Sequence, residues 1–309
     1  MPLLQVNAEG TNPRTVGGES RLAGALAALP MGAPVVVMIH GFRFSPTVPG
    51  QSPHTHILAL DPNPGCWKAL SWPRALGFGQ GHEDEGLCVA FGWEARGTIW
   101  RAYHEAAAAA TALARLLGRI EALRPGTRAD IVAHSLGARV ALQAMPLLSR
   151  PLVRHAILLA AAEFRRPAAR ALDCPAARGA LFVNVTSGEN DLFDFLIERL
   201  VPRWPDRALG LGTGQARPNW IDLQLDHPDT LQTLAALGHP VAPADRRICH
   251  WSLYLRPGIF SVYRALLRGD LAFGGLRARV DGRRSRRWSR LVAPPRRTAG
   301  LPCALEQST

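Results

Sequence analysis

The sequence predicts an α/β fold, in which a mostly parallel central sheet is covered by helices on both faces. Two aliphatic runs, Val35–Ile39 and Ala129–Ala133, have the composition of strands buried on both faces. Further strand patterns alternate with helical patterns along the chain, and this alternation is typical of parallel sheets. The other expected strands are Leu3–Val6, Leu87–Phe91, His155–Ala160, Leu181–Thr186 and Trp220–Leu225. The expected helices are Arg21–Leu29, Ile99–Leu123, Ala138–Leu148, Leu192–Leu200 and Ile259–Leu267.

Length and composition favour one large folded domain. The chain has 309 residues, of which 47% are hydrophobic and 19% are charged, so it can bury a substantial core. We expect this domain to span residues 1–275, with a proline-rich insertion at 43–86 that could act as a lid. Residues 276–309 are expected to form a flexible, arginine-rich tail.

The net charge of +12 is concentrated near the C-terminus. Residues 277–297 contain nine arginines and one acid, Asp281, and therefore hold eight of the twelve net charges. Trp288 is the one aromatic residue among them, too little for base stacking. The charge pattern therefore does not favour a nucleic-acid partner.

Cysteine and histidine spacing favours neither a disulfide framework nor a metal site. The five cysteines are widely spaced and form no C-x-x-C pair. His54, His56 and Asp61 lie in the insertion without a further spaced ligand. The sequence also shows no signal-peptide pattern and no apolar run of about 20 residues, so we expect a soluble, cytoplasmic protein without a transmembrane segment.

A nucleophile motif joins the second aliphatic strand to a helix. Ala133-His134-Ser135-Leu136-Gly137 places residues with little or no side chain two positions before and two positions after the serine. A sharp strand-to-helix turn requires such small residues, and it exposes the serine hydroxyl above the sheet. The same pattern is also found where a serine simply caps a helix.

With the upstream run Ile39-His40-Gly41-Phe42, this motif resembles the α/β-hydrolase superfamily, specifically its esterase and lipase-like members. The resemblance covers residues 34–268 and also includes the chain order serine, acid, histidine. It implies that Ser135 is the nucleophile of a catalytic triad. It further implies an oxyanion hole formed by the backbone N–H groups of Phe42 and Leu136.

The resemblance places the acid of the triad just after a later strand. Asp191 follows the expected strand Leu181–Thr186 and is the favoured residue. Glu189 and Asp194 remain alternatives, because each lies within three residues of it. A helix-capping role for these acids is also compatible with the sequence.

Three histidines follow Asp191 and could complete the triad: His227, His239 and His250. His250 is favoured because it precedes the last strong helical pattern and has apolar neighbours, which would keep the imidazole neutral. His227 precedes a proline and remains the main alternative.

The substrate predicted from the sequence is a small or apolar carboxylic ester, with no cofactor required. Trp67 and Trp72, in the insertion, are expected to bind it. A thioester or amide is an alternative substrate. A different class of function, a non-catalytic binding module that keeps the fold, also stays open.

Overall fold

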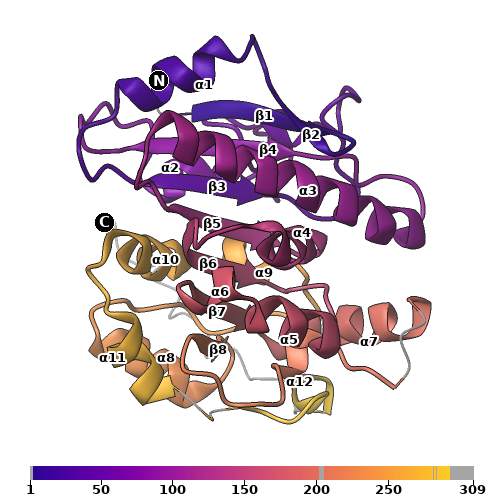
Figure 1. Ribbon diagram of the computed structural model, residues 1–309. Helices are drawn as coiled ribbons and strands as arrows, with labels where there is room; N and C mark the ends of the chain where they lie inside the picture. Colours follow the sequence, from indigo (N-terminus) through magenta and orange to yellow (C-terminus); the bar gives the residue numbers. More distant parts are fainter. Residues whose placement is uncertain (1–2, 202–204, 281, 283, 293–309) are drawn as a thin grey trace, which may run out of the picture.

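The computed structural model describes residues 3–201, 205–280, 282 and 284–292. Its centre is a sheet of eight strands in the order β2-β1-β4-β3-β5-β6-β7-β8, and every neighbouring pair is parallel except β1 and β2 (Figure 1). This confirms the predicted α/β class. The strands are β1 (Leu3–Glu9), β2 (Asn12–Thr15), β3 (Val35–Ile39), β4 (Leu87–Gly92), β5 (Ala129–His134), β6 (Val153–Leu159), β7 (Leu181–Thr186) and β8 (Trp220–Gln224).

Helices bury both faces of the sheet, and the central strands show why. Alternate residues of a strand point to opposite faces. Val35, Val37 and Ile39 of β3 accordingly join one hydrophobic core, whereas Val36 and Met38 join the other. The helices with residues in the first core are α1 (Ser20–Ala27), α3 (Ile99–Leu123), α4 (Leu136–Ala144), α5 (Arg165–Asp173), α6 (Pro175–Arg178) and α7 (Asp191–Leu200). Those with residues in the second are α2 (Trp72–Ala75), α8 (Pro228–Ala236), α9 (Ser252–Leu255), α10 (Ile259–Arg268) and α11 (Phe273–Val280).

Short elements complete the described chain. They are the 3-10 turns η1 (Pro53–Thr55), η2 (Met145–Leu147), η3 (Gly188–Asn190) and η4 (Leu209–Leu211), and the helix α12 (Ser289–Val292). No helix in the described ranges combines the length and apolar character needed to cross a membrane.

The insertion at 43–86 is packed against the body, although η1 and α2 are its only helical elements. Ile57, Leu58, Trp72 and Phe78 are fully buried in the second core. This apolar anchoring packs the loop against the residues on one face of the sheet.

The basic C-terminal segment also contacts the body, as far as Arg290, whose guanidinium donates to the Arg246 carbonyl. Leu276 and Val280 of α11 are buried, and the Arg284 guanidinium pairs with the Asp222 carboxylate at 3.1 Å. The boundary expected at residue 275 is therefore not where packing ends. The rest of the expected tail, residues 293–309, lies outside the described residues.

Candidate active site

Ser135 stands at the turn between β5 and α4 in a strained backbone conformation. Its φ of 57° and ψ of −122° are rarely adopted by residues other than glycine. Close backbone contacts hold this turn. A Cβ on Gly137 would lie 2.5 Å from the His40 carbonyl oxygen, and one on Gly41 would lie 2.7 Å from the Ser135 Cβ. Glycine is therefore required at both positions.

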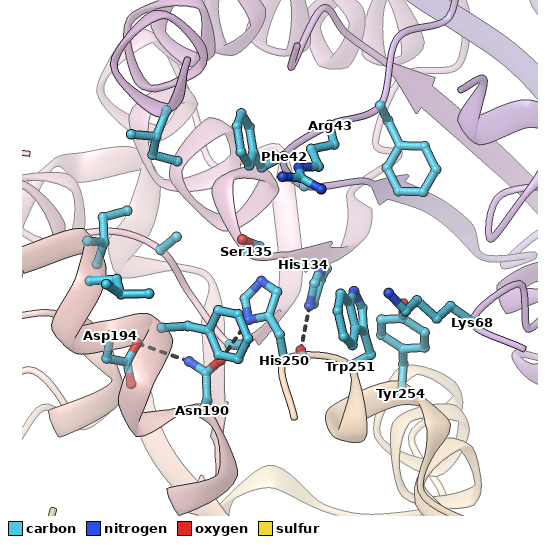
Figure 2. A pocket seen from close by; sticks show the side chains of 18 of the residues that line it. Phe42, Arg43, Lys68, His134, Ser135, Asn190, Asp194, His250, Trp251 and Tyr254 are labelled. Atoms are coloured by element: carbon cyan, nitrogen blue, oxygen red, sulfur yellow. Dashed lines mark hydrogen bonds between the residues drawn. The ribbon is translucent and has the colours of Figure 1, made fainter. Parts of the chain in front are cut away.

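Ser135 opens into a cavity of about 610 Å³ at the carboxyl ends of the central strands. The cavity is bordered by the residues after β3, β5, β6 and β7 and by the loop that precedes α9. Among its lining residues are Ser135, His250 and Asn190, and Figure 2 shows the His250 ring between the other two. Ligand sites of open α/β sheets lie at this edge.

His250 is held in the tautomer that a general base needs. Its Nδ1 lies 2.6 Å from the Asn190 Oδ1. Because an amide oxygen only accepts hydrogen bonds, Nδ1 carries the proton and Nε2 keeps its lone pair. The ring also stacks on Phe193, with centroids 4.7 Å apart. Burial, followed by the nearby His134 and Lys68, lowers the pKa of His250 well below its ordinary value, which keeps the imidazole neutral.

The orientation of the Asn190 amide is determined by Asp194. The Asn190 Nδ2 donates to the Asp194 Oδ1 at 3.0 Å, which turns the amide oxygen toward His250. Asp194 is buried against Gly210, where an added Cβ would overlap its carboxyl group. Burial raises the pKa of Asp194 to about 8. The hydrogen bonds that run from His250 through Asn190 thus end on the Asp194 carboxyl group.

Asp191, the acid favoured from the sequence, does not contact His250 in the described structure. Its Oδ2 accepts a hydrogen bond from the Trp288 backbone N–H at 2.7 Å, on the side of α7 that faces the C-terminal segment. Asn190, one residue earlier, takes the position beside the histidine. The sequence pattern did not indicate Asn190, because a triad is expected to place an acid beside its histidine.

Glu189, an alternative acid, has a structural partner instead. It forms a buried ion pair with Arg256, and it also accepts hydrogen bonds from the Ser187 hydroxyl at 3.0 Å and the Arg246 backbone N–H at 3.3 Å. The Glu189 carbonyl further accepts from the Cys249 N–H at 2.9 Å. These bonds connect the loop after β7 to the loop that carries His250.

Two backbone N–H groups are available near Ser135. Leu136 is the first residue of α4, so its N–H has no acceptor within the helix. The Phe42 N–H has no acceptor among the described residues. His40 Nδ1 lies 2.9 Å from the Gly41 carbonyl, and its Nε2 accepts from the Trp93 N–H at 3.0 Å. Since C=O and N–H point opposite ways in a trans peptide, this contact turns the Phe42 N–H away from His40.

The other histidines considered for the base lie elsewhere. His227 is the N-terminal cap residue of α8 and does not line the cavity. His239 is engaged with the Ser261 hydroxyl at 2.8 Å. His134 does line the cavity, and its Nε2 donates to the His250 carbonyl at 3.0 Å, which supports the loop that carries His250.

Neither tryptophan expected to bind substrate lines this cavity. Trp72 is fully buried, with its ring edge-on to Tyr254 at 5.3 Å. Trp67 is 55% exposed and lies edge-on to Trp251 at 5.9 Å. The insertion contributes Lys68, the only lysine in the chain, to the cavity wall instead.

The residues considered for a metal site have separate partners. His54 Nε2 is 2.7 Å from the Asn7 Oδ1, His56 Nε2 is 3.2 Å from the Cys66 Sγ, and Asp61 pairs with Arg74 at 2.7 Å. In the described part of the chain, no three histidine, cysteine or acidic side chains are grouped as metal ligands.

Comparison with known proteins identifies no relative of this chain. No model of a protein family matches the chain, and no curated protein matches it as a relative. The arrangement combines a hydroxyl on a strained turn, a neutral imidazole with a free Nε2, and two available N–H groups. Acyl transfer is the chemistry that uses all of these features.

Proposed function

We propose that the protein is a serine hydrolase of the α/β-hydrolase type that cleaves a carboxylic ester through an acyl-enzyme at Ser135. The observation that carries the proposal is the pairing, in one cavity, of a serine in a strained strand-to-helix turn with a histidine whose Nδ1–H is held by Asn190. A serine that only caps a helix does not require the backbone strain found at Ser135.

In the proposed reaction, the Ser135 Oγ attacks the acyl carbon while His250 Nε2 takes the hydroxyl proton. The N–H groups of Phe42 and Leu136 stabilise the resulting oxyanion, each by about 3 kcal/mol. The tetrahedral intermediate then collapses, the bond to the alcohol breaks, and His250 returns the proton to the leaving oxygen. Water repeats the sequence on the acyl-enzyme and releases the acid.

Asn190 has a defined part in this scheme. Its amide oxygen keeps the proton on Nδ1, so Nε2 remains the base through both half-reactions. An amide carries no charge, so it stabilises the imidazolium less than a carboxylate would. We therefore expect slower turnover than for a triad with an acid beside the histidine.

The proposal is tested with 4-nitrophenyl hexanoate and a fluorophosphonate probe. The wild-type protein is expected to hydrolyse the ester and to be labelled at Ser135. Ser135→Ala should lose labelling and at least ~10³-fold in kcat with an unchanged circular dichroism spectrum. Ser149→Ala, at an exposed serine outside the cavity, is the matched control and should keep full activity.

Unchanged turnover in Ser135→Ala would exclude the serine mechanism. Absence of both labelling and turnover in the folded wild-type protein would instead favour a non-catalytic binding module with this fold.

A further inference from the structure

The cavity around Ser135 has two chemically different walls. Phe193, Leu196, Ile197 and Leu200 line it from α7 at the spacing i, i+3, i+4, i+7, so one face of that helix forms an apolar wall. The Trp100 indole N–H donates to the Leu200 carbonyl and joins the start of α3 to the end of α7 beside this wall.

The other wall is aromatic and cationic. Lys68, from the insertion, lines the cavity with its Nζ 3.3 Å from the centroid of the Trp251 ring. Arg43 lines the cavity as well. Its backbone φ of 78° is unusual for a residue other than glycine. Figure 2 shows Lys68 beside Trp251 and Tyr254, with Ser135 and His250 between this wall and Asp194.

Neither cation has an anionic partner in the described part of the chain. No ion pair or side-chain hydrogen bond joins Lys68 or Arg43 to another described residue, and their contacts are with aromatic rings. Among the described residues, Asp194 is the one carboxyl group that lines the cavity, and it accepts a hydrogen bond from the Asn190 amide on the far side. A cation–π contact does not neutralise the charge of an ammonium group, and it leaves N–H donors that can bind an anion.

The Lys68 ammonium is also held in place. A turn closes between the Cys66 carbonyl and the Ala69 N–H at 2.8 Å, and Trp67 packs edge-on against Trp251. This arrangement limits the flexibility that a surface lysine usually has. A pre-positioned, unneutralised cation in a ligand cavity is typical of a site for an anion.

We infer that the ester substrate carries a carboxylate on one side of its scissile bond and an apolar chain on the other. The carboxylate contacts Lys68 and Arg43, and the apolar chain lies against α7. This inference rests on the proposed function, since it takes Ser135 as the point between the two parts of the substrate.

The test uses two matched pairs of esters, because the carboxylate could be on the alcohol or on the acyl part. The first pair is 4-(hexanoyloxy)benzoate and its neutral counterpart 4-(hexanoyloxy)benzamide. The second is mono-4-nitrophenyl adipate and 4-nitrophenyl hexanoate. In at least one pair, kcat/KM is expected to be about tenfold higher for the anionic ester at low ionic strength, with the preference weakening as salt is added.

Lys68→Met should lower that anionic-to-neutral ratio about tenfold, and Lys68→Arg should largely retain it. Arg101→Met removes a positive charge from the exposed surface of α3, outside the cavity, and should leave the ratio unchanged. Equal kcat/KM values within both pairs, or a ratio that Lys68→Met does not alter, would overturn the inference while leaving ester hydrolysis intact.

The affinity for a ligand that cannot be hydrolysed tests the anion site independently of turnover. The ether 4-(hexyloxy)benzoate cannot be hydrolysed, and isothermal titration with Ser135→Ala is expected to show binding about tenfold tighter than that of 4-(hexyloxy)benzamide. Adding Lys68→Met should remove the difference. If no ester is cleaved but this difference is found, the proposed function fails and the anion site stands; equal affinities would overturn the anion site.

Discussion

The loops after β5 and after β7 both contribute residues to the cavity. They differ in what decides which side chain of the loop reaches it. At the first, the position of Ser135 follows from its own backbone, because the turn has room only for small residues nearby. At the second, Glu189, Asp191 and Asp194 are all available, and the side chain that reaches His250 is the amide of Asn190.

Partners far along the chain explain why the acids of the loop after β7 do not contact His250. Glu189 pairs with Arg256, and Asp191 accepts from the N–H of Trp288. Each partner lies far along the chain from the loop. A buried carboxylate is stable only where a cation or donor reaches it, so the fold as a whole decides which acid faces which neighbour. Local geometry can therefore be predicted from a short motif, whereas the assignment of buried acids cannot.

The largest expected effect tests which histidine belongs to the site. We expect His250→Ala to lower kcat by at least ~10³-fold, because it removes the proposed general base. His227→Ala should cost less than ~10-fold, since His227 is at the start of α8. Steady-state kinetics with 4-nitrophenyl hexanoate measures both. The reverse ranking would show that the loop before α8 supplies the base.

The next effect tests the difference between Asn190 and Asp191. Asn190→Ala should lower kcat by about 10²-fold, because Nδ1 of His250 loses its acceptor and the ring is free to change tautomer. Asp191→Ala should change kcat by less than about threefold, since its carboxylate binds the Trp288 N–H instead. A larger loss in Asp191→Ala than in Asn190→Ala would restore Asp191 as the acid.

A smaller effect is expected at Asp194, which acts through Asn190 as a positioning residue. Asp194→Leu should lower kcat about tenfold, because the Asn190 amide loses the acceptor that orients it. Asp194→Asn keeps an oxygen that can accept from Asn190 and should recover most of the activity. Equal losses in the two variants, with matching thermal stability, would contradict this orienting role.

Much of the fold could be predicted from the sequence, because its strands are aliphatic runs with clear boundaries. The missed strand is β2, which begins with Asn12 and Pro13, two residue types of low strand propensity, and pairs only with β1 at the edge of the sheet. Proline is tolerated there because an edge strand leaves one side of its backbone unpaired. Composition alone does not reveal such a strand.

The candidate site was predictable where it depends on local backbone and less so where it depends on packing. Ser135 and His250 were both named from the sequence, and the structure brings them to one cavity. Trp67 and Trp72 were expected there because large aromatic residues suit a binding site, but an aromatic side chain fits a core equally well. Their positions depend on Trp251 and Tyr254, which lie far along the chain.

The smallest expected effect concerns pH between 8 and 6. An exposed histidine with a pKa near 6.5 would lose about fourfold in neutral fraction over this range. The pKa of His250 is lowered well below that value by burial, His134 and Lys68. We therefore expect kcat/KM to change by less than about twofold from pH 8 to pH 6, and to fall only at lower pH as the imidazole takes up a proton.

Unfolding has to be separated from this titration, because other buried histidines also titrate. Burial lowers the pKa of His40 to about 3 and the pKa of His134 to about 4. Their folded-state pKa values lie below those of the unfolded chain, so the unfolded state binds protons first as pH falls through about 6.5, and stability is lost below that pH. Thermal unfolding at each pH identifies the range in which the protein stays folded. Within that range, a fourfold fall in kcat/KM by pH 6 would show that His250 is exposed to water in solution, and the loop after β7 would then not hold the base as tightly as the loop after β5 holds the serine.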